Sequence, residues 1–133
     1  MRYKGRVMQQ TGAILRSLGI ELGYYDAGNW KQARLIDHIV DTWGELMTAN
    51  NQILMSFESK AYYNVKMREV VQNKWKPFLW QLETQLAREG TPFIAGEELT
   101  IADWPVLGPR TVAWCIQWLD RRSSMPLTHH RWF

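Results

Sequence analysis

The chain has 133 residues, a formal net charge of +3 and 46% hydrophobic residues. This length is typical of one domain with a single core, and the composition excludes disordered, collagen-like and coiled-coil chains. One cysteine, Cys115, cannot form an intramolecular disulfide. The sequence therefore excludes a disulfide-stapled miniprotein and favours a reducing, cytoplasmic location.

Membrane and nucleic-acid partners are not expected. No stretch reaches the roughly 18 consecutive apolar residues of a membrane-spanning helix, and no apolar signal segment follows the basic N-terminus. The 16 Lys and Arg are interspersed with 13 acidic residues, whereas nucleic-acid binding usually requires a basic stripe on a recognisable module. The eight tryptophans instead favour a surface that is buried against another protein.

The N-terminal quarter combines a short extended piece with a helix. Residues 2–9 are predicted to be extended, with Gly5 in a turn that closes a hairpin whose first strand is largely missing. From Thr11 the apolar residues recur every three or four positions, which predicts a helix over 12–22. Gly23 follows at the position that a C-terminal cap favours.

Two longer apolar stripes follow. The first predicts a long helix over 30–57, capped at its start by Asp26 or Asn29. The second runs over 67–90 and is interrupted or kinked near Pro77, because proline has no N–H to donate and its ring collides with the carbonyl one turn back.

A capping motif is the sharpest local signal in the chain. Thr100 can accept a hydrogen bond from the N–H three residues on, and Asp103 can reach back to the N–H of Thr100. Leu99 can pack on Trp104 as a hydrophobic staple. A helix is therefore predicted from Ile101 through residue 119, with an irregular start because two prolines lie in it. The fold as a whole is predicted to be mostly α, helices packed on helices.

No common catalytic template is present, so we expect neither a metal site nor a catalytic residue. His129 and His130 are adjacent on a polar tail, a spacing that rarely serves one metal. His38 is interpreted as a surface or partly packed residue, and Cys115 as a core thiol on an apolar helix face.

The pair Gln10 and Thr11 differs from these residues. It lies where an extended segment turns into a helix, which presents unpaired backbone N–H groups beside an amide and a hydroxyl. Such a junction binds carboxylates, and Gly12 allows a ligand to approach the backbone. The alternative is that Thr11 only caps the helix.

These segments resemble the cytosolic glutathione transferases, closest to the mu, pi and sigma types. Residues 10–16 are similar to the Gln-Ser-x-Ala-Ile-Leu-Arg segment that ends the family's thioredoxin-like half, and residues 93–103 to the capping segment of its all-helical half. Between them, Asp37, Asp41 and Glu45 match the first long helix of that half. The resemblance covers about residues 5–120.

This resemblance implies a helical bundle of the glutathione transferase C-terminal type over 26–133. Residues 1–25 would be a remnant of the thioredoxin-like domain, its last strand and helix. Gln10 and Thr11 would hold the γ-glutamyl end of glutathione, the substrate. Glu45 matches an acid that several classes lend across the dimer to the glutamyl amine; the alternative for these acids is a solvated helix face.

The family's thiol-activating Tyr, Ser or Cys would lie upstream of Met1. The expected function is therefore a truncated, noncatalytic binding or assembly subunit of the glutathione transferase type. The alternative is part of an active enzyme that conjugates glutathione to electrophiles once the missing N-terminal region or a partner chain completes the site. A protein partner or a second copy is expected to dock through the helices predicted over 12–22 and 30–57.

Overall fold

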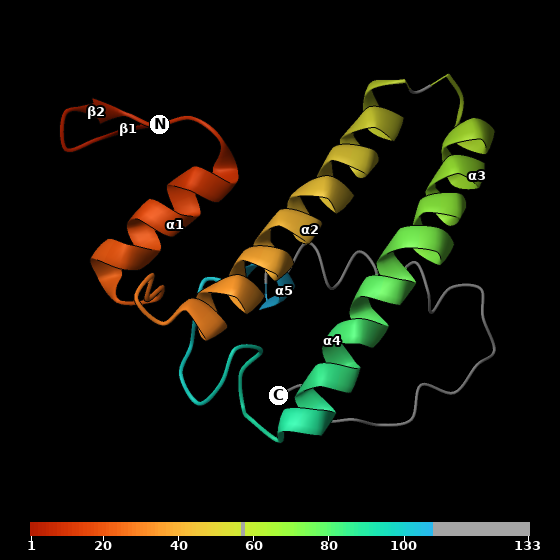
Figure 1. The fold of residues 1–133 in the computed structure, drawn as a ribbon. Coiled ribbons are helices and arrows are strands. Elements are labelled where there is room, and N and C mark those ends of the chain that lie inside the picture. Colours follow the sequence, from red (N-terminus) through yellow and green to blue (C-terminus); the bar gives the residue numbers. More distant parts are fainter. Residues whose placement is uncertain (57, 108–133) are drawn as a thin grey trace.

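The computed structural model describes residues 1–56 and 58–107, which form a mostly helical fold, as predicted (Figure 1). Its elements are β1 (Arg2–Tyr3), β2 (Arg6–Val7), α1 (Thr11–Leu22), α2 (Trp30–Met55), α3 (Lys60–Val70), the π-helical turn η1 (Val71–Trp75), α4 (Lys76–Glu89) and α5 (Trp104–Leu107). The predicted helical run from 108 to 119, Cys115 and the pair His129 and His130 lie outside the described residues.

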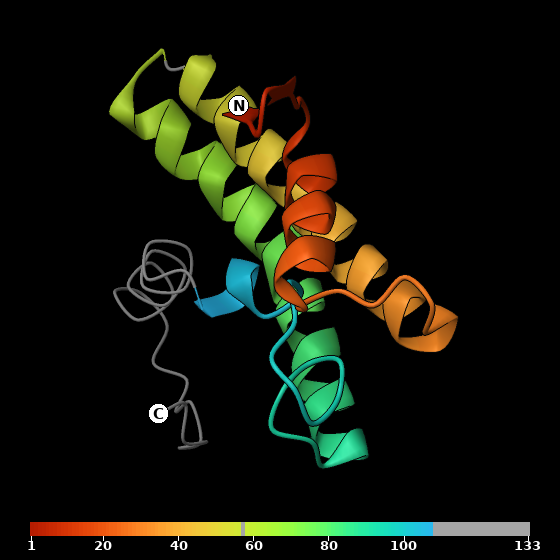
Figure 2. The same cartoon turned by 90° about the vertical axis from the view of Figure 1, so that its left-hand side faces the viewer.

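The long helix α2 lies at the centre of the arrangement. The segments α3, η1 and α4 follow one another as a continuous rod along one side of α2, and α1 packs on another side (Figures 1 and 2). None of the helices within the described part of the chain is long and apolar enough to cross a bilayer.

The N-terminal hairpin has both of its strands. β1 and β2 pair antiparallel through a two-residue loop, Lys4 and Gly5, and both loop residues have positive φ (46° and 77°). That is the geometry of a type I′ turn, whose twist matches that of the strands. The expectation that the first strand is largely missing was therefore wrong. Tyr3 and Lys4 both bond to Glu21 of α1, which attaches the hairpin to that helix.

The predicted bounds of the first two helices are close to the observed ones. Gly23 ends α1 in the left-handed conformation and donates its N–H to the carbonyl of Gly19, as predicted. α2 begins at the predicted residue and ends two residues early. Asn29 is the cap, because its side chain accepts from the N–H of Gln32, while Asp26 accepts from a backbone N–H within the preceding turn.

The predicted interruption near Pro77 is present as the π-helical turn. The N–H of Lys76 bonds to the carbonyl of Val71, five residues back, and Pro77 then occupies the first turn of α4. A proline is tolerated there because it has no N–H to satisfy. The wider π turn thus lets the rod continue past the proline.

The capping motif forms around Asp103. Its Oδ2 accepts from both the N–H (2.8 Å) and the hydroxyl (3.1 Å) of Thr100, and its Oδ1 accepts from the N–H of Ile94 (2.9 Å). The Thr100 hydroxyl accepts from the N–H of Ala102, one residue earlier than expected. All four residues are buried, so this carboxylate joins the 91–96 loop to the start of the last described helix.

The helix predicted from Ile101 begins at Trp104 instead, and residues 101–103 form a turn. The reason is Pro105, which a start at Ile101 would place beyond the first turn, where its missing N–H breaks the helix. Trp104 has 58% of its surface exposed, and its packing on Leu99 stays a prediction.

The core lies between α2, the rod and the segment that follows α4. Buried Asn50 of α2 accepts a hydrogen bond from the indole of Trp75 (3.2 Å), and Trp75 meets the ring of Phe78 edge-on at 6.4 Å. The apolar members of this core are Ile36, Ile39, Val40, Leu46, Ile53, Met67, Val71, Trp75, Phe78, Leu82, Ile94, Ile101 and Ala102.

Candidate functional site

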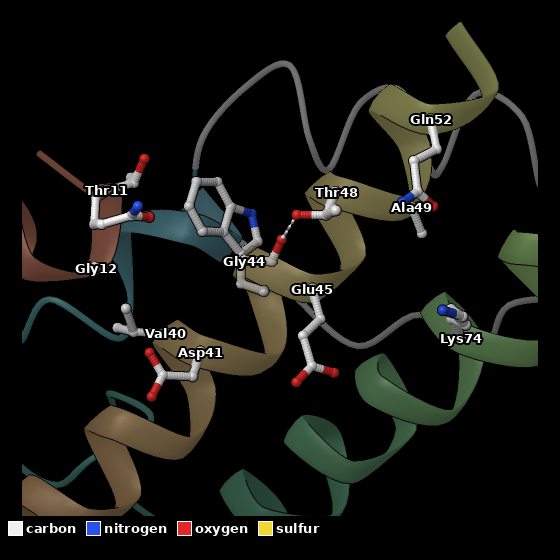
Figure 3. A pocket seen from close by; sticks show the side chains of 12 residues that line it. Thr11, Gly12, Val40, Asp41, Gly44, Glu45, Thr48, Ala49, Gln52 and Lys74 are labelled. Atoms are coloured by element: carbon white, nitrogen blue, oxygen red, sulfur yellow. Dashed lines mark hydrogen bonds between the residues drawn. The ribbon is translucent and has the colours of Figure 1, made fainter. Parts of the chain in front are cut away.

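An open pocket of about 610 Å³ lies between the start of α1, the middle of α2 and η1 (Figure 3). Gln10, Thr11 and Glu45, the three residues predicted from sequence to bind glutathione, all line it. The other lining residues are Gly12, Val40, Asp41, Trp43, Gly44, Thr48, Ala49, Gln52 and Lys74. The chain therefore brings three segments, 10–12, 40–52 and residue 74, to one place.

The start of α1 is strained and lacks a side-chain cap. Gln10 takes φ 68° and ψ 120°, which a residue with a side chain rarely adopts, and Thr11 is the first helical residue. Among the described residues no side chain caps this helix, so the interpretation of Thr11 as a cap was wrong. Strain of this kind costs about 1–3 kcal/mol and is concentrated at ligand sites.

Arg16 fixes the start of α1 against α2. Its Nε bonds to Asp37 (2.6 Å) and its NH2 group to Asp41 (2.8 Å), while the Tyr25 hydroxyl donates to Asp37 at 3.1 Å. Partial burial opposes the charge of Arg16, but the bonds to these two carboxylates raise its pKa above the ordinary value. Gly12 leaves room for the guanidinium, because a Cβ there would lie 2.9 Å from Arg16 NH1.

The three acids of α2 therefore divide into two groups. Asp37 and Asp41 are bound to Arg16, so the alternative of a merely solvated face does not describe them. Glu45 is exposed and makes no ion pair within residues 1–56 and 58–107. In Figure 3 Asp41 and Glu45 lie between Thr11 on one side and Lys74 on the other. Glu45 thus leaves a free carboxylate at the pocket, in the same chain as Gln10.

Among the lining residues that the sequence reasoning missed, Trp43 and Lys74 carry polar groups of interest. Trp43 lies within the apolar stripe that predicts the helix over 30–57, yet its indole N–H is buried and has no partner in the described part of the chain. A buried donor without an acceptor is destabilising by about 1–3 kcal/mol. Lys74 lies in the π turn. The sequence feature that could have indicated it is the polar run at 72–74, which interrupts the apolar stripe.

Two further predictions concern His38 and metal sites. His38 is exposed, as expected, with its Nε2 3.1 Å from the side-chain nitrogen of Gln81. Groups of three or more residues that could hold a metal do not occur among the residues that the structure describes.

Residues 49–108 match the family of the glutathione S-transferase C-terminal domain. No curated protein and no solved structure matches the chain. The matched range holds the end of α2, the rod and the Thr100–Asp103 motif, and of the pocket residues it includes Ala49, Gln52 and Lys74. The mu, pi or sigma type stays a prediction. The family resemblance drawn from sequence is thus confirmed over residues 49–108, which are similar to a glutathione S-transferase C-terminal domain.

Proposed function

We propose that the pocket between α1 and α2 binds the γ-glutamyl end of glutathione, and that the chain by itself is a noncatalytic binding or assembly subunit of the glutathione transferase type. The observation that carries this proposal is the meeting of Gln10, Thr11 and Glu45 in one pocket. The family match to residues 49–108 supports the proposal independently, because Gln10, Thr11 and Glu45 lie outside the matched range.

The glutamyl group carries an ammonium and a carboxylate on one carbon, and the pocket offers a partner to each. The first backbone N–H groups of α1 lie at the positive end of the helix dipole, where they can bind the carboxylate. The Thr11 hydroxyl and the Gln10 amide lie beside them. Glu45 supplies an unpaired carboxylate for the ammonium. Charge-assisted bonds of this kind are about twice as strong as neutral ones.

The noncatalytic part of the proposal concerns the sulfur. A thiol near its ordinary pKa of about 8.5 needs a placed donor or cation to become a thiolate at neutral pH. Of the hydroxyls among the described lining residues, those of Thr11 and Thr48, the second already donates to the carbonyl of Gly44. The cation of the lining, Lys74, lies on η1 and not on the side of Gln10 and Thr11, and the Trp43 indole nitrogen is buried. The alternative is an active glutathione S-transferase whose site is completed by a further N-terminal region or by a partner chain.

Calorimetric titration of the full chain with glutathione tests the pocket. We expect millimolar binding that is lost in Gln10→Ala and weakened about tenfold in Glu45→Gln, because each removes a polar partner of the glutamyl group. Gln9→Ala is the matched control, since Gln9 is exposed and does not line the pocket. No heat at millimolar glutathione, or an equal loss in Gln9→Ala, would refute the pocket.

A separate assay tests the absence of catalysis. The pure chain is incubated with glutathione and a chromogenic aryl halide, and we expect no turnover above the uncatalysed rate. Turnover at rates typical of the family would refute the proposal that the chain is noncatalytic. It would not contradict the binding of glutathione in the pocket.

We also retain the proposal of a cytoplasmic assembly through α1 and α2. Large apolar side chains are exposed on both helices: Ile20 and Leu22 on α1, and Trp30, Leu54 and Met55 on α2. Large apolar side chains that are exposed in one chain can be covered by a protein contact. Light scattering should give a native mass that exceeds the 15.7 kDa of one chain, alone or with its partner; a mass of one chain at all concentrations argues against self-association.

A further inference from the structure

A second pocket, of about 860 Å³, opens where α2 begins and α4 ends. Its walls are the first turns of α2, the last turn of α4 and the loop over 91–96, which lie together at one end of the molecule (Figure 1). It shares no lining residue with the pocket proposed for glutathione. Whatever binds here is therefore independent of that function.

Cationic side chains converge on this second pocket from two helices. Lys31 and Arg34 come from the start of α2, and Arg88 from the end of α4. Within residues 1–56 and 58–107 neither Lys31 nor Arg34 makes an ion pair. Lys31 Nζ and the guanidinium carbon of Arg34 each lie 5.9 Å from the ring centroid of Trp30. The indole thus contacts both cations, and no described residue forms an ion pair with either of them.

One acid opposes these charges. Glu89 accepts from the guanidinium of its neighbour Arg88 at 2.7 Å, an exposed pair of low strength. The remaining charge of the lining is positive, and the dipole at the start of α2 has the same sign. The pocket is therefore electrostatically built for an anion.

The floor of the pocket has a different character. Ile94 is buried, and Leu35 and Ala95 are partly buried, so the lining includes an apolar surface as well as the cations. The side-chain amide of Gln32 donates to the carbonyl of Ala95, which ties the loop to α2 and closes this side. A volume of this size suits a small organic molecule.

The geometry points to a site for a small organic dianion, a phosphomonoester or a dicarboxylate, whose charged group lies among Lys31, Arg34 and Arg88 and whose apolar body rests on Leu35 and Ile94. Guanidinium groups bind phosphate and carboxylate oxygens in pairs, which is the chemistry that both ligand types share. A singly charged or neutral molecule of the same shape would lack the second contact.

Titration of the full chain with phenyl phosphate and with phthalate at low ionic strength tests this site by calorimetry or by NMR shifts. We expect at least one of these two dianions to bind, and the one that binds more tightly identifies the ligand as a phosphomonoester or a dicarboxylate. Phenol, which has the same ring without the charge, should not bind. Arg34→Gln should weaken binding about tenfold, and Glu89→Gln should tighten it severalfold by freeing Arg88. Salt should weaken binding in every case.

Lys60→Gln is the matched control, because it removes one positive charge at the opposite end of the rod (Figure 1). Gln10→Ala is the second control, and unchanged phenyl phosphate binding in it keeps this site separate from the glutathione pocket. Should Arg34→Gln alter the circular dichroism of the fold, Lys31→Gln replaces it. The inference is overturned if neither dianion binds at about 10 mM, as for sites of ordinary affinity, or if Lys60→Gln weakens binding as much as Arg34→Gln.

Discussion

The two sides of α2 are held by different forces. On the side of the rod, α2 buries a continuous apolar surface in which Ile36, Ile39, Met67 and Val71 are almost completely shielded from solvent. On the side of α1, α2 is held by the Arg16 ion pairs and by the Tyr25 hydrogen bond to Asp37. The apolar contacts of α1 are fewer: Gly19 approaches Ile101, and the partly buried Leu15 packs on the core. Burial of apolar surface is the dominant favourable term in folding, whereas partly exposed ion pairs contribute little.

This difference matters for the glutathione pocket, because one of its walls lies on the apolar side of α2 and the other on the side of α1. Glu45 and Lys74 lie on the two elements that share the apolar core, whereas Gln10 and Thr11 lie at the start of α1, whose attachment to α2 is mainly polar. Regions with few buried apolar contacts open locally at a lower free energy than the whole molecule unfolds. We therefore expect α1 to be the less stable wall, and the following substitutions test that expectation.

The largest effect is expected for Phe78→Ala. Phe78 is buried and packs on Trp75, and its truncation leaves a cavity in the apolar side, so the free energy of unfolding should fall by about 3–5 kcal/mol. Leu15→Ala, on the partly buried face of α1, should cost about 1–2 kcal/mol because the site is closer to solvent. Urea denaturation measures both. Equal losses would contradict the contrast between the two sides.

Gly19→Ala should have the next largest effect. A Cβ at Gly19 would lie 2.8 Å from a methyl of Ile101 and 2.9 Å from the Cβ of Tyr25, which cannot move without its backbone. Overpacking of this kind costs about 1–3 kcal/mol, more than the gain in helix propensity. Gly44→Ala is the control, because nothing lies within 4 Å of its added Cβ, and it should stabilise the protein by up to about 1 kcal/mol.

Much of this architecture could be predicted from the sequence where the signal is local. The helix bounds near Thr11 and Trp30, the cap at Gly23 and the partnership of Thr100 with Asp103 depend on residues within one or two turns. The helix start at Trp104 was missed although its cause, Pro105, is local, because the capping pair was given more weight than the proline.

The rest depends on contacts between distant segments, which periodicity does not show. Asp37 and Asp41 have the spacing of a solvated helix face, and only their contact with Arg16, more than twenty residues away, makes them structural. The same holds for Asp103, whose bond to Ile94 crosses a loop. In the candidate site, Gln10 and Thr11 were indicated by the junction of an extended segment and a helix, and Glu45 by resemblance, whereas Trp43 and Lys74 become pocket residues only once the helices pack.

Arg16→Gln tests the polar side directly. It removes both ion pairs to α2 and should lower the free energy of unfolding by about 1–2 kcal/mol, because the carboxylates are partly exposed. Amide hydrogen exchange should accelerate in α1 and stay unchanged in the rod. Lys66→Gln breaks a surface pair of similar length within α3 and serves as control, with about 0.5 kcal/mol or less expected. Equal acceleration in α1 and the rod would show that α1 opens only with the whole fold.

Tyr25→Phe should have the smallest effect at neutral pH, about 1 kcal/mol for the lost bond to Asp37. Burial, together with the hydrogen bond to Asp37, raises the pKa of the Tyr25 hydroxyl above its ordinary value of 10.0. The unfolded chain therefore releases this proton first, and the stability due to neutral Tyr25 is present below about pH 10 and is lost as the pH rises through the raised pKa.

The pH dependence separates Tyr25 from a purely apolar contact. Denaturation series from pH 8 to pH 11.5 should show the free energy of unfolding falling less steeply above about pH 10 in Tyr25→Phe than in the unchanged chain. Tyr63→Phe is the control, because burial raises the pKa of Tyr63 as well, on α3. Both variants should flatten the curve, but only Tyr25→Phe should speed amide exchange in α1. If it does not, Tyr25 stabilises the fold without holding α1 to α2, and the polar attachment depends on Arg16 alone.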